Sequence, residues 1–74
     1  MLGLGLGRAI AERRRAAHKT QEDLAYEADL SLRHLQKIEA GQTFPRLQTL
    51  FAIGEALEIK PHRLLDRAEV LQKL

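Results

Sequence analysis

Residues 20–41, TQEDLAYEADLSLRHLQKIEAG, contain two short helical patterns that are separated by four residues. Thr20 and Asp23 have the [ST]-x-x-[DE] spacing of a capping box, which predicts the start of the first helix. Ser31 is placed to cap the second helix, and Gly41 is placed to end it as the first residue beyond its cap. The stretch therefore predicts a helix, a tight turn and a second helix, and this arrangement decides the fold.

Helical periodicity continues on both sides of this stretch. Apolar residues recur from about Leu6 to His18 and again from Leu47 to Leu57, and Pro61 is placed to begin a last helix. Almost no strand signal is present, and only three aromatic residues are available, so Leu, Ile and Ala must build the interior. The sequence predicts an all-α fold, a compact bundle of five short helices forming one domain over residues 1–74. In the fourth helix we expect the inward residues to be Leu47, Leu50, Phe51, Ile53 and Leu57.

The two ends of the chain carry separate expectations. Residues 1–5 belong to the glycine-rich stretch MLGLGLG, which predicts a flexible arm or a loosely wound helix start. Residues 67–74 extend the last helix and continue an apolar stripe. Either this stripe is the contact of a homodimer, which we expect, or it packs against the first helix and the Leu-rich N-terminus. The stripe consists of Leu64, Ala68 and Leu71, with Val70 and Leu74 beside it.

Composition excludes several classes of protein. The chain has no cysteine, so it has neither disulfides nor a thiolate metal site. No apolar run approaches the ~20 residues of a membrane span, which predicts a cytoplasmic protein with no membrane contact. The net charge of +2 and the isoelectric point near 9.4 permit an anionic partner without requiring one.

Enzymatic function is not supported by any residue pattern. Ser31 is the only serine and already serves as a cap, while the three histidines are dispersed without metal-ligand spacing. The stretch GLGLG resembles a dinucleotide-binding loop only superficially, because no strand precedes it. We therefore expect no catalytic residues, no cofactor and no metal site.

The outward face of the second helix in the opening stretch has two interpretations. If Leu35 points inward, a rotation of ~100° per residue turns Arg33, Gln36 and Lys37 outward and leaves Leu32 at the edge. Such a face is either ordinary solvated surface or a recognition helix for DNA. Arg and Lys can donate to guanine, Gln can pair with adenine, and Leu can touch a thymine methyl group. Periodicity alone leaves both interpretations open.

One ion pair follows from the burial of charge. Arg14 falls on the apolar stripe of the first helix, and Glu39 adjoins the inward residues Leu35 and Ile38. A charge that points inward is tolerated only when it is paired and hydrogen-bonded. We therefore predict that Arg14 and Glu39 pair and fix the two helices together.

Three motifs together resemble a known family. They are LG-x-x-I-x-x-x-R over residues 6–14, TQ-x-x-LA over 20–25 and IEAG-x-x-x-P over 38–45. In this order they resemble the lambda-repressor-like helix-turn-helix family, often called Xre-type, which comprises many bacterial and phage regulators. The resemblance covers about residues 6–66 without gaps, and it favours DNA over a solvated face.

The resemblance implies roles for individual residues. Gln21 is expected to bond a DNA phosphate and support the recognition helix; otherwise it is an ordinary exposed residue. Leu32 is expected to contact bases, with partial burial against the turn as the alternative. The expected base-contacting residues are Leu32, Arg33, Gln36 and Lys37, and the expected phosphate-contacting residues are Gln21, Gln42, Thr43 and Arg46.

The expected function is sequence-specific, non-catalytic binding of double-stranded DNA by a small transcriptional regulator. Repression is the expected sense of regulation, and a homodimer on a palindromic operator is the expected assembly. The alternative is a protein-interaction module with the same fold, such as an antitoxin that covers a toxin. A strongly basic recognition face favours DNA, whereas duplex binding that vanished at modest salt would favour the alternative.

Overall fold

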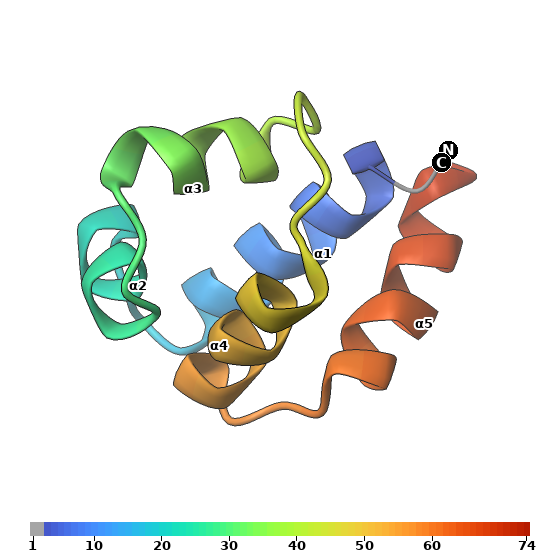
Figure 1. Cartoon of the computed structure of the whole chain (residues 1–74). Helices are drawn as coiled ribbons and strands as arrows, with labels where there is room; N and C mark the ends of the chain where they lie inside the picture. The colour runs from blue at the N-terminus through green and yellow to red at the C-terminus, as the bar shows by residue number, and fades with distance from the viewer. Residues whose placement is uncertain (1–2) are drawn as a thin grey trace.

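Five helices joined by short loops make up residues 3–74, the part of the chain that the computed structural model describes (Figure 1). This part of the chain contains no strand, which confirms the expected all-α class. The helices are α1 (Gly3–Ala16), α2 (Gln21–Glu27), α3 (Leu32–Glu39), α4 (Leu47–Leu57) and α5 (Pro61–Gln72).

The predicted caps hold the starts of α2 and α3. The backbone N–H of Asp23 donates to Thr20 Oγ1 at 3.0 Å, and the Thr20 N–H donates to Asp23 Oδ2 at 2.9 Å. The bond from the Thr20 backbone N–H to the Asp23 carboxylate, with a smaller contribution from the Thr20 side chain, holds the pKa of Asp23 below its usual value. At α3 the Ser31 hydroxyl accepts the His34 N–H at 3.0 Å. Each cap satisfies a backbone donor that the first helical turn leaves free.

Two residues with a left-handed backbone conformation flank α3 in the chain. Asp29 in the α2–α3 turn has φ 58°, and Gly41 after α3 has φ 77°. The Gly41 N–H donates to Ile38 O at 3.1 Å, and the Gln42 N–H donates to Lys37 O at 2.9 Å. This pair of bonds is the Schellman arrangement, so α3 ends where the sequence predicts.

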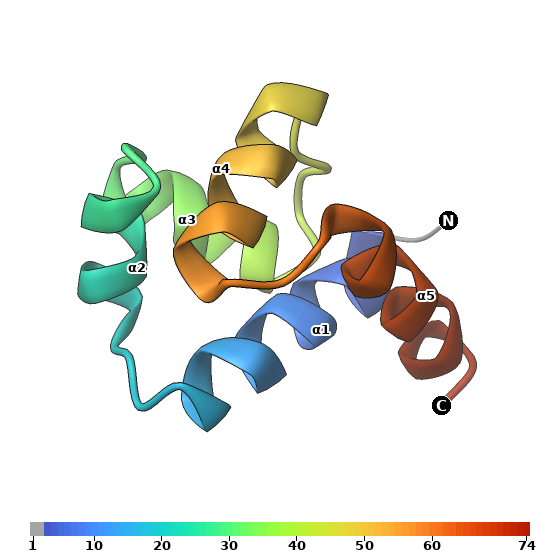
Figure 2. The same ribbon diagram turned by 90° about the horizontal axis from the view of Figure 1, so that it is seen from below.

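The core contains apolar side chains from all five helices. Leu6 and Ile10 of α1, Leu35 of α3 and Ile53 of α4 are fully buried. The helix α1 lies against both α3 and α5 (Figures 1 and 2). In α5 the stripe of Leu64, Ala68 and Leu71 is buried within the chain, where α5 packs on α1. The expectation of a dimer contact is therefore wrong for Leu64, Ala68 and Leu71, which pack on α1 as the alternative expected, whereas Val70 and Leu74 beside them are exposed.

The glycine-rich start of the chain is helical because it packs closely on two other helices. A Cβ at Gly5 would lie 2.2 Å from Ala68 O, and a Cβ at Gly7 would lie 2.4 Å from Glu39 O. The Gly5 N–H also donates to Gln72 Oε1 at 2.6 Å. Of the two alternatives for residues 1–5, a helix start is the one that residues 3–5 show, because α1 begins at Gly3; residues 1–2 lie outside the described residues.

The orientation of α4 differs from the expected one at two residues. Leu50, Ile53 and Leu57 are buried as expected, but Leu47 is 70% exposed and Phe51 is 55% exposed. The buried residues recur at i, i+3 and i+7 and define the face that meets the core. Because Phe51 lies one residue beyond Leu50, it points away from this face, and Leu47 lies in the first turn, where the helix extends beyond the core.

Candidate nucleic-acid interface

The outward face of α3 carries the residues expected to contact bases. Arg33, Gln36 and Lys37 are exposed, whereas Leu32 is half-buried. A shallow hollow runs along this face, lined by Arg33, Gln36, Lys37, Ala40 and Gln42. The helix therefore presents amide and cationic donors side by side, with Leu32 at the edge, as the helical rotation predicts.

The charges on this face are available to a ligand. Among the described residues, neither Arg33 nor Lys37 has a carboxylate within 4.0 Å, and no acidic side chain lines the hollow. Unpaired Arg and Lys side chains can donate to the O6 and N7 acceptors of guanine in the major groove. The α3 face can thus bind an anionic surface and read hydrogen-bond acceptors on it.

The predicted ion pair fixes α3 to α1. Arg14 Nε donates to Glu39 Oε2 at 2.8 Å, and Arg14 Nη2 donates to Glu39 Oε1 at 3.1 Å. The side chains of Arg14 and Glu39 are only 10% and 6% exposed. The remaining nitrogen, Arg14 Nη1, donates to Lys19 O at 2.9 Å and so also fixes the segment before α2. Both charges are paired and hydrogen-bonded, as burial requires.

Gln21, the first residue of α2, completes this network. Its Nε2 donates to Glu39 Oε1 at 2.9 Å, and the residue is half-buried rather than freely exposed. Glu39 thus receives donors from α1 and from α2. The contact accounts for the supporting role expected of Gln21, because it holds the start of α2 against the end of α3.

The remaining residues expected to contact phosphates lie in the loop between α3 and α4. Gln42 is exposed and lines the α3 hollow. Thr43 is half-buried, and Arg46 is exposed next to the start of α4, where it makes no side-chain capping bond. The structure therefore brings Gln42 to the α3 face and leaves Thr43 and Arg46 farther along the loop.

Two groups of surface residues were missed at the level of sequence. The first comprises Arg8 and Arg15, which line a hollow between α1 and α3 together with Gln21 and Gln36. Their i, i+7 spacing places both on one face of a helix, and this spacing could have indicated from the sequence that they act together. The second is an apolar patch, which we define as the exposed side chains Phe44, Leu47 and Phe51.

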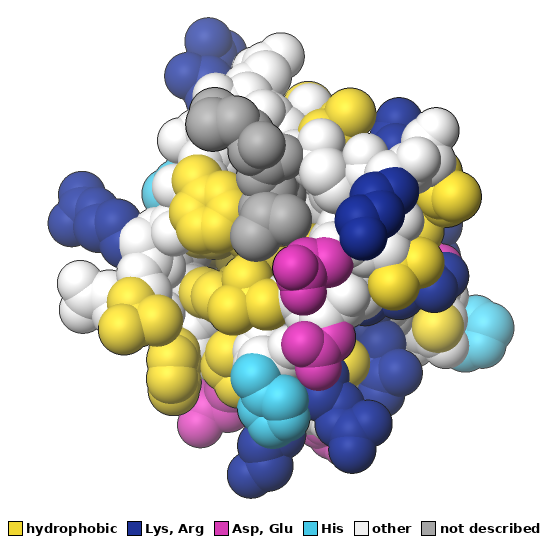
Figure 3. All heavy atoms as spheres, turned by 90° about the vertical axis from the view of Figure 1, so that its right-hand side faces the viewer, with side chains coloured by type: hydrophobic (Ala, Val, Ile, Leu, Met, Phe, Trp, Pro, Cys, Tyr) yellow, Lys and Arg dark blue, Asp and Glu magenta, His cyan; other side chains and the backbone are white. Residues whose placement is uncertain are grey.

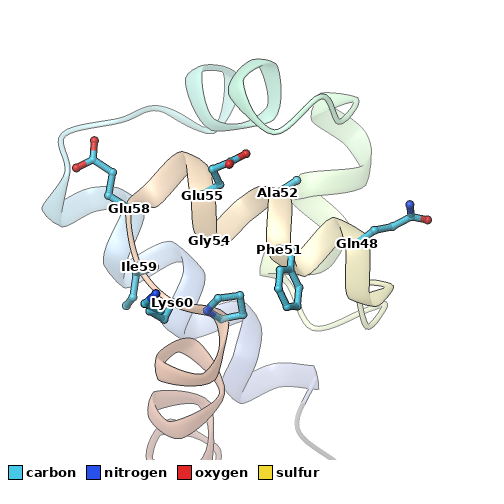
Figure 4. A pocket seen from close by; sticks show the side chains of 9 residues that line it. Gln48, Phe51, Ala52, Gly54, Glu55, Glu58, Ile59 and Lys60 are labelled. Atoms are coloured by element: carbon cyan, nitrogen blue, oxygen red, sulfur yellow. The ribbon is translucent and has the colours of Figure 1, made fainter.

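The apolar patch continues into an open groove behind α4. Figure 4 shows Phe51 pointing toward the segment that carries Ile59 and Lys60. Hydrophobic side chains also gather on one part of the face in Figure 3, with charged side chains of both signs around them. The groove is lined by Gln48, Phe51, Ala52, Gly54, Glu55, Glu58, Ile59, Lys60 and Pro61. Exposed apolar surface of this kind often marks a protein contact.

Other types of site find little support in residues 3–74. This part of the chain has no group of three or more His, Cys, Asp and Glu residues that could hold a metal ion. None of its helices has both the length and the apolar character that a membrane crossing needs.

Comparison with known proteins places this geometry among regulators. A family model described as Helix-turn-helix matches residues 10–64. The cryptic phage CTXphi transcriptional repressor RstR of Vibrio cholerae is 38% identical over 58 residues, which are 78% of this chain and 52% of RstR. The chain thus spans about half the length of this curated relative.

Two solved structures share the fold. The clp gene regulator ClgR of Corynebacterium glutamicum superposes with a TM-score of 0.90 at 25% identity, over 93% of this chain and 73% of that chain. The restriction-modification controller protein C.AhdI of Aeromonas hydrophila superposes with a TM-score of 0.80 at 30% identity, over 82% of this chain and 92% of that chain.

Proposed function

This chain belongs to the helix-turn-helix family of lambda-repressor-like DNA-binding transcriptional regulators, and we propose that it binds double-stranded DNA sequence-specifically by placing α3 in the major groove. The observation that carries the proposal is the α3 face, on which Arg33, Gln36 and Lys37 are exposed and the two cations have no acidic partner among the described residues. In this role α3 reads base edges without performing chemistry on them.

The rigidity of α3 supports this role. Base readout requires side chains that approach the groove in a fixed register, and the backbone must supply that register. Arg14 and Gln21 both bond to Glu39 in the last turn of α3, and Ser31 caps its first turn. The recognition helix is thus held at both ends before DNA arrives.

Four polar residues around α3 are proposed to contact phosphates and set the orientation of the protein on the duplex. Gln21 stands at the start of α2 with one amide hydrogen bonded to Glu39 and one still available. The others follow α3 in the chain. They are Gln42 and Arg46, which are exposed, and Thr43, which is half-buried.

We propose that two copies bind a palindromic operator, with half-sites about one helical turn, ~34–36 Å, apart. A single recognition helix reads only a few base pairs, so a second copy supplies the remaining affinity. The buried stripe of α5 is not available for this contact. We assign the contact to the apolar patch of Phe44, Leu47 and Phe51. Phe44 lies in the loop that joins α3 to α4, and Leu47 and Phe51 lie on α4, so a contact here would be made by the same surface of each copy, as a two-fold axis requires.

The sense of regulation is proposed to be repression, and the proposed location is the cytoplasm. The relative from Vibrio cholerae, RstR, is a transcriptional repressor, and this similarity supports repression. A protein bound to an operator blocks access to it by occupancy alone, and such a mechanism needs no catalytic residue.

The direct experiment is selection of bound sequences from a pool of random duplexes. The proposal expects one enriched, approximately palindromic motif, and competition by unrelated duplex should be at least ~10³-fold weaker than competition by the motif. A pool that showed no enrichment after several rounds at physiological salt would overturn it.

A second candidate function is favoured by the same apolar patch. An antitoxin, or another protein-interaction module, would use the patch and the groove behind α4 to cover a toxin or other partner protein rather than a second copy. Duplex binding that disappeared at modest salt, without an enriched motif, would favour this candidate, because only the electrostatic, sequence-independent part of binding would then be present.

A further inference from the structure

A second hollow lies beside the recognition face, between α1 and α3. Three of its residues, Arg8, Ala11 and Arg15, share one face of α1 at i, i+3 and i+7. The full lining is Arg8, Ala11, Arg15, Gln21, Gln36, Glu39 and Ala40. Gln21 and Gln36 add amide groups, so polar side chains of three helices meet at this hollow.

The charge in this hollow is positive. Arg8 and Arg15 are exposed, and neither has a carboxylate within 4.0 Å among the described residues. Glu39 is the single acidic residue of the lining, and both of its carboxylate oxygens are occupied by donors from Arg14, with a further donor from Gln21. The Arg14 charge balances that of Glu39, which leaves the two exposed arginines uncompensated.

The hollow is continuous with the recognition face. Gln36 and Ala40 line both this hollow and the one that runs along α3. A single tract therefore crosses from α1 to α3 and carries four cations without an unpaired carboxylate among its lining residues. These cations are Arg8, Arg15, Arg33 and Lys37.

Arg8 is held in place before any ligand binds. Its Nη1 donates to Leu71 O, near the C-terminal end of α5, at 3.3 Å. The bond uses one of five guanidinium N–H groups, so the others remain free to donate. A side chain that is already restrained loses less conformational entropy when it contacts a ligand.

We propose that Arg8 and Arg15 contact phosphates of the DNA strand that borders the groove occupied by α3. This inference rests on the proposed function and extends the DNA interface to α1. Guanidinium groups form two parallel bonds to phosphate oxygens, and Gln36, at the border of the two hollows, can donate beside them. Arg8 and Arg15 are seven positions apart, which corresponds to ~10.5 Å along the helix, so the two side chains reach phosphates from opposite ends of the hollow.

The test compares Arg15→Gln with Arg13→Gln in the full chain. The two substitutions remove the same charge from neighbouring exposed residues of α1, but Arg13 does not line the hollow. We expect Arg15→Gln to reduce the slope of log affinity against log salt concentration by about 0.9. The substitution should lower the affinity for the selected duplex and for an unrelated duplex by similar factors, because a phosphate contact carries no sequence information. Arg13→Gln should leave the slope close to that of the wild type.

Arg8→Gln should reduce the salt slope by a similar amount. This substitution also removes the bond to Leu71 O, so thermal unfolding of the same sample measures any loss of stability separately from the change in DNA binding. Equal slopes for Arg15→Gln and Arg13→Gln, with a wild-type protein that still selects its duplex, would overturn the inference and leave the proposed function standing. A wild-type protein that showed no selection of duplex would overturn both.

Discussion

Arg14 on α1 holds both carboxylate oxygens of Glu39 on α3, at 2.8 and 3.1 Å, in a site where each side chain is nearly buried. The pair joins helices whose residues are 25 positions apart in the chain. Gln21 donates to the same carboxylate, so three helices meet at Glu39. We infer that this network sets the position of α3 relative to the rest of the molecule.

Removal of one partner should therefore cost more than removal of both. Glu39→Ala leaves the Arg14 guanidinium buried without its carboxylate, and we expect the free energy of unfolding to fall by ~3–5 kcal/mol. Chemical denaturation of the purified variant measures this change.

The double variant Arg14→Met/Glu39→Leu is the matched control, because it replaces both charges with apolar side chains. It should lose much less stability than the sum of the two single variants. Additive losses in this cycle would contradict the coupling of the two residues.

The N-terminal glycines offer a second prediction. Gly5→Ala and Gly7→Ala should each destabilise the protein by ~1–3 kcal/mol, because the new methyl group would meet backbone oxygens of α5 and α3 at 2.2 and 2.4 Å. This expected loss is net of the ~1 kcal/mol that alanine gains over glycine in a helix. Gly3→Ala is the control, since its Cβ would meet Gly41 O at an ordinary 3.5 Å. Melting temperatures that rose for all three variants would contradict the close packing of α1.

The apolar patch leads to a third prediction. Phe51→Gln should shift the protein from dimer to monomer in sedimentation at micromolar concentration, because it removes apolar area from the proposed contact. Val70→Gln is the control: Val70 is 52% exposed, close to the 55% of Phe51, but it lies on α5. A wild-type protein that sedimented as a monomer and bound DNA as a single copy would rule out the dimer.

Local sequence signals predicted the helix-turn-helix well because its ends depend on short-range chemistry. Thr20 with Asp23, Ser31 and Gly41 each act within a few residues, and each lies where the sequence placed it. The Arg14–Glu39 pair was also predictable, since two inward charges of opposite sign require each other.

The expectations that differ from the structure depend on contacts between parts of the chain that are distant in sequence. Gly5 resembles a helix breaker locally, and only the position of Ala68 on α5 explains why glycine is needed there. The α5 stripe showed that an apolar face exists but not what covers it. Leu47 and Phe51 of α4 are apolar without being inward, because composition does not fix the rotation of a short helix.

The most direct test of the central claim, that α3 reads bases, is the equilibrium affinity of Arg33→Ala and Lys37→Ala for the selected duplex and for a scrambled duplex of equal length. We expect each variant to lose ~1–3 kcal/mol on the selected duplex, about 5- to 150-fold in affinity, with an unchanged unfolding transition and a smaller loss on the scrambled duplex. Unchanged affinity of both variants for the selected duplex would contradict the assignment of α3 as the recognition helix.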